Sequence, residues 1–147
     1  MDRIPSSVLF ACTFNAVRSP MAAAILSRMH GHRIAVDSVG VRAGELDGFV
    51  VAVMEEFGID VSAHESKTFD DLEDTSFDVI VSLSPEAHHS ALELTRYSDC
   101  EVVFWNTLDP SIISGNRDER LRAYREVRDQ LQDRIRERFP TDLSGGL

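Results

Sequence analysis

Cysteine is scarce in this chain of 147 residues, which contains only Cys12 and Cys100. Two cysteines so far apart exclude a fold held together by several disulfides, and they are too few for a structural zinc site without histidine ligands. No histidine stands at metal-ligand spacing from a cysteine; the histidines are His30, His32, His64, His88 and His89. We therefore expect no metal ion and no cofactor.

Long apolar runs and positive charge are scarce as well. No segment approaches the roughly 20 apolar residues that cross a bilayer, and the apolar run after the polar N-terminus is too short for a secretory signal. The net charge is −10 at pH 7, and such a surface repels nucleic acid and anionic membranes. These absences predict a cytoplasmic protein that binds neither nucleic acid nor a membrane.

What the chain does contain is an alternation of strand and helix patterns. Runs rich in β-branched and aromatic residues predict buried strands at Ser7–Ala11, Arg33–Asp37, Asp78–Leu83 and Glu101–Trp105. Apolar residues at helical spacing predict helices at Pro20–His30, Asp47–Phe57, Pro85–Leu94 and Asp118–Phe139. This order predicts an α/β fold in which helices cover both faces of a parallel sheet. We expect one domain over residues 1–147, with a frayed tail at residues 140–147.

The most informative segment is the loop from Cys12 to Ser19, which begins one residue past the first strand and leads into the helix expected at Pro20. In a parallel sheet, ligands bind at the carboxyl ends of the strands. The N–H groups of such a loop and the positive end of the helix form an anion site, and Arg18 adds a planar fork that matches two phosphate oxygens. We expect phosphate or another oxyanion to be held by Thr13, Phe14, Asn15, Ala16, Val17 and Ser19.

Cys12, at the start of this loop, is the candidate nucleophile. The positive field of the loop stabilises a thiolate, and a thiolate beneath a bound phosphoryl group attacks phosphorus in line. Ser19 can donate a hydrogen bond to the sulfur or cap the helix, and both roles stay open. Asn15 tolerates the left-handed backbone conformation that a tight loop demands. A lone cysteine is more often a buried apolar residue. The interpretation of Cys12 as a nucleophile therefore depends on its position between a strand and a helix.

The segment VLFACTFNAVRSPMA resembles the low-molecular-weight protein tyrosine phosphatases, and the similarity covers nearly the whole chain. Further matches follow in the family's order: Asp37-Ser38, Gly58-Ile59-Asp60, Ala63-His64 before a Ser-Lys pair, and Asp109-Pro110. The resemblance implies a single three-layer domain with a four-stranded parallel sheet in the order 2-1-3-4. It implies that Asp109 is the general acid and base, and that Ser38 and His64 support Asn15.

The activity implied by the resemblance is hydrolysis of phosphate monoesters, including protein phosphotyrosine, through a thiophosphate on Cys12. Three positions depart from the family in ways that affect specificity. Phe14 stands where glycine usually precedes the asparagine, and it could wall the pocket or merely cover the loop. Ser111 stands where tyrosine-specific members carry an aromatic residue, and Ala16 differs from the threonine that marks phosphoarginine phosphatases of this fold.

A fourth departure concerns redox chemistry. Val17 stands where many members have a second cysteine, so the loop disulfide that would protect Cys12 from over-oxidation cannot form. Cys100 is a remote candidate for that task, and its place just before a strand favours a simple buried role.

Two other functions are compatible with the same residues. The fold also hosts arsenate reductases, whose thioredoxin-coupled members need a second cysteine just after the third strand. Here that segment carries Ser82 and Ser84, so a reductase would need an external thiol such as glutathione. The third interpretation is a phosphate-binding module without catalysis, which the intact Cys12, Arg18 and Asp109 disfavour.

Overall fold

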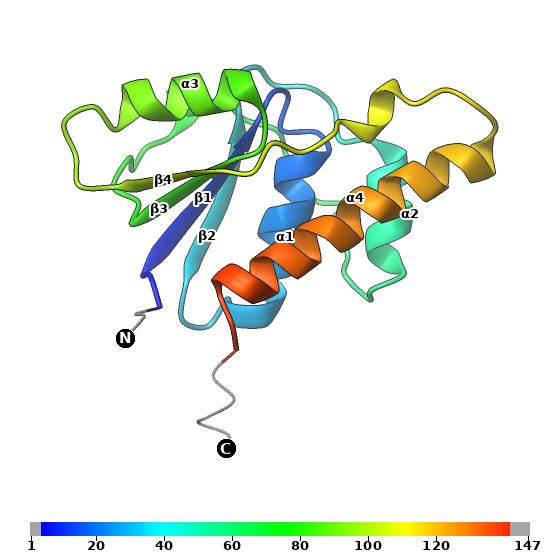
Figure 1. Ribbon diagram of the computed structural model, residues 1–147, viewed down its shortest axis with the longest axis horizontal. Coiled ribbons are helices and arrows are strands. Elements are labelled where there is room, and N and C mark those ends of the chain that lie inside the picture. The colour runs from blue at the N-terminus through cyan, green and yellow to red at the C-terminus, as the bar shows by residue number, and fades with distance from the viewer. Residues whose placement is uncertain (1–3, 142–147) are drawn as a thin grey trace.

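The structure, a computed structural model, describes residues 4–141. Within that range the strands form one parallel sheet in the order β2-β1-β3-β4 (Figure 1). The strands are β1 (Ser7–Cys12), β2 (Ala35–Gly40), β3 (Val79–Ser82) and β4 (Glu101–Phe104). The predicted four-stranded parallel sheet and its strand order are confirmed. The predicted frayed tail lies outside the described residues from residue 142 onward.

Helices cover both faces of this sheet, so the predicted three-layer α/β architecture is confirmed. Figure 1 shows α3 on one face, with α1 and α4 on the other and α2 packed beside α4. The helices are α1 (Arg18–His30), α2 (Gly48–Glu55), α3 (Pro85–Leu94) and α4 (Arg117–Arg138). Two short 3-10 turns, η1 (Phe69–Asp71) and η2 (Pro110–Ile112), lie in the connecting loops.

Alternation along β1 explains how one central strand serves two cores. Val8 and Phe10 belong to the large core beneath α1, α2 and α4, whereas Leu9 and Ala11 belong to the smaller core beneath α3. All four side chains are completely buried, because successive side chains of a strand point to opposite faces of the sheet. Packing on both faces therefore holds this strand in place, and it fixes the position of the last residue of the strand, Cys12.

Some boundaries differ from those predicted. Cys12 is the last residue of β1 rather than the residue after it, because its pairing with β2 continues to Gly40. Helix α1 begins at Arg18 rather than Pro20, and the proline occupies a first-turn position where its missing N–H costs nothing. Strand β2 begins at Ala35 instead of Arg33, because the chain first completes a turn in which the N–H groups of residues 33 and 34 both donate to the His30 carbonyl.

Candidate active site

The loop of residues 13–17 joins the end of β1 to the start of α1 at the carboxyl edge of the sheet. Cys12 lies at its base and is only 1% exposed. Its Sγ is 2.9 Å from Ser19 Oγ and 3.4 Å from Ser19 N, whose N–H points at the sulfur. The N–H donates to the sulfur, and a donor in this position favours a thiolate. The hydroxyl can donate either to the sulfur or to the Val39 carbonyl, which lies 3.3 Å from it. The alternative role of Ser19 as a helix cap is wrong: the cap position is Val17, and Ser19 lies inside the first turn.

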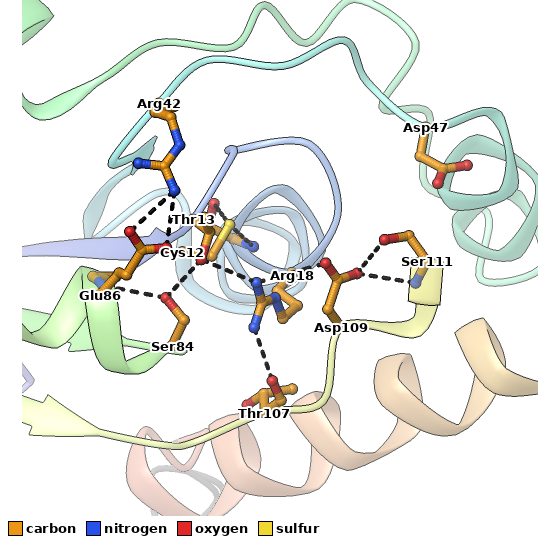
Figure 2. Close-up of polar contacts among 12 residues, drawn as sticks. Cys12, Thr13, Arg18, Arg42, Asp47, Ser84, Glu86, Thr107, Asp109 and Ser111 are labelled. Atoms are coloured by element: carbon orange, nitrogen blue, oxygen red, sulfur yellow. Dashed lines mark hydrogen bonds and ion pairs between the residues drawn. The ribbon is translucent and has the colours of Figure 1, made fainter. Parts of the chain in front are cut away.

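Arg18 is buried and fixed from two sides (Figure 2). Its Nη1 donates to the Thr107 carbonyl at 2.9 Å, and its Nη2 lies 3.4 Å from Thr13 Oγ1. The same Nη2 is 3.9 Å from Oδ2 of Asp109. The guanidinium is therefore held beside the loop with part of its fork directed toward the site.

Asp109 precedes η2 and lies beside the Arg18 guanidinium (Figure 2). Both bonds from Ser111 go to Oδ1, and Oδ2 is left on the side of Arg18. The carboxylate is about one-quarter exposed, so a substrate or water can reach it. The structure therefore brings together Cys12, Arg18 and Asp109, the three residues expected to carry the chemistry.

A cavity of about 380 Å³ opens beside Arg18 and Asp109. Apolar and acidic side chains both line it. The lining residues are Phe14, Ala16, Val17, Arg18, Gly44, Glu45, Leu46, Asp47, Asp109 and Ser111. Phe14 is 45% exposed at the rim, and the Arg42 guanidinium lies 5.4 Å from the centre of its ring. Of the two roles open for Phe14, the structure supports the pocket wall.

Asn15 and Ser19 were expected to bind substrate, but both side chains are completely buried and bond to protein groups. Asn15 adopts a φ of 55°, the left-handed conformation anticipated for it. Its Nδ2 donates to Ser19 Oγ at 2.9 Å and to Ser38 Oγ at 3.0 Å. Neither side chain is therefore left for an oxyanion, because both are used to build the loop, and the Ser19 N–H is directed at the Cys12 sulfur.

A second set of contacts holds the carbonyl and amide oxygens of Asn15. His64 Nε2 lies 2.9 Å from the Asn15 backbone oxygen, which also accepts from Ser66 Oγ at 2.8 Å. The Lys67 N–H donates to Asn15 Oδ1 at 2.9 Å, and its ammonium pairs with Asp37 at 2.7 Å. Sequence reasoning missed Ser66 and Lys67, although the Ser-Lys pair after His64 had been noticed without a role.

Residues 41–47, which we call the rim segment, run beside the loop, and their backbone pairing with it was not predicted. Their N–H groups donate to the loop carbonyls: Val41 to Cys12, Arg42 to Thr13, Gly44 to Phe14 and Asp47 to Ala16, at 2.8–3.2 Å. With the carbonyls engaged on the outside, the loop N–H groups are free to face an anion. Gly40 permits this approach, because a Cβ there would lie 2.6 Å from Asn15 N. Hydrogen bonds between backbone groups cannot be predicted from the pattern of side chains.

Cys100 is far from the site. It precedes β4, whose first residue pairs with Val79, and Val79 pairs with Val8 of β1. Cys12 lies four residues beyond Val8, which is a rise of about 13 Å along the strand, and β4 is two strands away from β1. A disulfide between Cys12 and Cys100 is therefore geometrically excluded. Burial, together with nearby Asp78 and Glu101, raises the pKa of the Cys100 thiol. It therefore supplies little thiolate at neutral pH.

Two further features of residues 4–141 bear on function. No group of three or more histidine, cysteine, aspartate or glutamate side chains in that range is arranged to hold a metal ion. No helix there has the length and apolar character needed to cross a membrane.

Fold and site together define an α/β protein with a buried cysteine at the end of β1, at the base of a loop that leads into α1, and with an aspartate beside the arginine that ends this loop. The family model of the low molecular weight phosphotyrosine protein phosphatases matches residues 7–143. The chain belongs to this family, as its sequence suggested.

Curated relatives within the family have different activities. An arsenate reductase of Halalkalibacterium halodurans is 32% identical, covering 88% of this chain and 91% of the relative. A protein-arginine-phosphatase of Geobacillus stearothermophilus is 30% identical, covering 95% and 99%. A glutaredoxin arsenate reductase of Synechocystis sp. is 29% identical, covering 87% and 92%. Among solved structures, an arsenate reductase in the phosphate-binding state superposes with a TM-score of 0.72 at 27% identity, covering 90% of this chain and 95% of the other.

Proposed function

We propose that this protein hydrolyses phosphate monoesters through a thiophosphate formed on Cys12. The observation that carries the proposal is the buried Cys12 sulfur, contacted by the hydroxyl and the N–H of Ser19, at the base of a loop that lines a cavity together with Arg18 and Asp109. The protein-arginine-phosphatase relative and the phosphate bound by an arsenate reductase of the same fold support it. Free thiols suit the reducing cytoplasm that the sequence favours.

In the first step, the phosphoryl group occupies the loop, where the N–H groups and Arg18 neutralise its oxygens. The Cys12 thiolate attacks phosphorus in line, so an S–P bond forms as the P–O bond to the leaving group breaks. Asp109, protonated at this stage, gives its proton to the departing oxygen. The alcohol or phenol leaves through the open cavity.

In the second step, water replaces the leaving group beside Asp109. The carboxylate takes a proton from this water as its oxygen attacks phosphorus, and the S–P bond breaks. The electron pair of that bond returns to sulfur, where the Ser19 hydroxyl and N–H stabilise the thiolate again. Inorganic phosphate then leaves, and Asp109 is protonated for the next cycle.

Hydrolysis of p-nitrophenyl phosphate in the absence of metal tests this proposal. We expect turnover that vanadate inhibits, and we expect Cys12→Ser to abolish turnover while phosphate still binds. Cys100→Ser is the matched control, because that cysteine lies at the far end of the sheet and should not matter. Wild-type turnover by Cys12→Ser would show that the nucleophile is assigned wrongly.

Arsenate reduction is the second candidate, favoured by the arsenate reductases among the relatives. In that reaction the Cys12 thiolate would bond to arsenic, and a thiol would then reduce As(V) while a disulfide forms. Cys100 cannot reach Cys12, so the reductant must be an external thiol.

One comparison separates the two functions. Arsenate-dependent consumption of NADPH is measured with glutathione, glutaredoxin and glutathione reductase, beside aryl phosphate hydrolysis by the same preparation. Phosphate release without arsenate reduction supports the phosphatase. Arsenate reduction without phosphate release would replace it by the reductase.

A further inference from the structure

Tyr124, on α4, lies outside the catalytic loop but is connected to it through one carboxylate. Its hydroxyl donates a hydrogen bond to Oδ2 of Asp47, the last residue of the rim segment. The Tyr124 side chain is completely buried, and its ring packs on Phe49 with a centroid distance of 5.1 Å. The ring is thus fixed by packing, and the hydroxyl is directed at a single acceptor.

Asp47 transmits this contact to the catalytic loop. Its Oδ1 accepts from Phe49 N at 2.8 Å and caps α2, while its own N–H donates to the Ala16 carbonyl at 3.2 Å. Both Asp47 and Ala16 line the cavity. A shift of the Asp47 carboxylate would therefore move the backbone that holds one end of the loop.

The other end of the rim segment is held differently. Arg42 pairs with both carboxylate oxygens of Glu86 at 3.0 Å, and both side chains are more than half exposed. An exposed ion pair contributes little to stability. The Tyr124–Asp47 contact is part-buried and its Tyr124 ring is completely buried, so it is the stronger of these two side-chain anchors.

We propose that Tyr124 is a positioning residue for the anion-binding loop. Its hydroxyl fixes Asp47, Asp47 fixes the rim segment, and the rim segment keeps the loop carbonyls outside and the loop N–H groups toward the oxyanion. Burial, the hydrogen bond to Asp47 and the charges of Asp47 and Asp109 raise the pKa of Tyr124, so the hydroxyl stays a donor at every working pH. The inference rests on the proposed function, because it assigns the loop to oxyanion binding.

Tyr124→Phe tests the inference, since it removes one hydroxyl and keeps the packed ring. Loss of a hydrogen bond to a charged acceptor predicts about tenfold weaker binding of inorganic phosphate by calorimetry, and a similar fall in kcat/KM. Hydrogen exchange of the rim-segment amides should be faster. Tyr97→Phe is the matched control: Tyr97 is the other tyrosine of the chain and is 94% exposed, so none of these quantities should change.

A double-mutant cycle separates positioning from general destabilisation. Asp47→Asn keeps an oxygen for the α2 cap but removes the charged acceptor, so Tyr124→Phe should lose most of its effect on phosphate binding in that background. Unchanged phosphate affinity in Tyr124→Phe would overturn the inference while leaving the proposed hydrolysis intact. A wild-type protein that binds phosphate but hydrolyses no ester would overturn the hydrolysis alone. Failure of the wild type to bind phosphate would overturn both.

Discussion

Ser111 holds one oxygen of Asp109 by two hydrogen bonds, from its N–H at 2.9 Å and from its hydroxyl at 2.7 Å. The second oxygen of the carboxylate is thereby oriented toward Arg18. This arrangement suits the proposed role of general acid, because the oxygen on the side of Arg18 is left to exchange a proton with a substrate.

Asp109→Asn should slow hydrolysis of p-nitrophenyl phosphate, and it should slow hydrolysis of alkyl phosphates by more, about 10²–10⁴-fold. Alkoxides are poorer leaving groups than nitrophenolate, so they depend more on a proton from the acid. Steady-state kinetics with both substrates measures the difference. Asp133→Asn, an exposed carboxylate on α4, serves as the control. Equal losses for the two substrates would contradict the role of general acid.

Phe14→Ala should raise KM for aryl phosphates about threefold to tenfold, because stacking of two aromatic rings contributes on the order of 1 kcal/mol. Inhibition by inorganic phosphate, which has no aryl group, should stay the same. Phe14→Leu keeps an apolar wall but removes the ring, so its KM should lie between those of wild type and Phe14→Ala. An aryl KM unaffected by both changes would mean that Phe14 only covers the loop.

Asn15→Ala should destabilise the protein more than Asn15→Gly does. Both changes remove the side-chain hydrogen bonds, but only alanine also resists the φ of 55°. The left-handed conformation costs an L-residue roughly 1–2 kcal/mol, which glycine avoids. Urea unfolding of the two variants and the wild type measures this difference. An alanine variant as stable as the glycine variant would show that the backbone relaxes there.

Stability should fall in acid partly through Glu56. Hydrogen bonds from Arg125 and Arg128 lower the pKa of this carboxyl from 4.5 to about 2. A carboxyl with a lowered pKa stabilises the fold fully above its unfolded value, near 4.5, and loses that contribution as the pH falls toward about 2. The free energy of unfolding should therefore depend less on pH in this window in Glu56→Gln. Identical pH dependence in variant and wild type, by urea unfolding, would exclude Glu56 as a contributor.

Local patterns were sufficient to predict the loop that holds Cys12 and Arg18. Cys12 and Arg18 are six residues apart in one loop, so the strand before them and the helix after them fix their relation. The place of Asp109 at the edge of the sheet near Cys12 was predictable because parallel strands deliver the loops that follow them to the same edge. Its proposed role came from the family resemblance, since an Asp-Pro pair alone indicates only a turn. Three of the four strands were placed within about a residue or two, since buried β-branched runs have few alternatives.

Long-range pairing was beyond sequence reasoning. The rim segment bonds to the loop through backbone groups, which any residue carries, so no side-chain pattern marks it. Tyr124 and Asp47 are 77 positions apart. They fall in two separate predicted helices, Asp118–Phe139 and Asp47–Phe57, and neither helical pattern indicates the contact. The start of β2 was misplaced for a related reason: the apolar Ile34 fits a strand pattern, but its N–H completes the turn after α1.

The position of Cys100 at the far end of the sheet makes the repair of an oxidised Cys12 a bimolecular event. A protein with a neighbouring thiol regains its nucleophile at a rate set by its own geometry. Here the rate is the product of a rate constant and the concentration of thiol in solution. Under oxidant, the fraction of molecules with a reduced Cys12 therefore depends on the concentration of thiol around the protein. When that concentration falls, the mean time that Cys12 stays oxidised increases in inverse proportion.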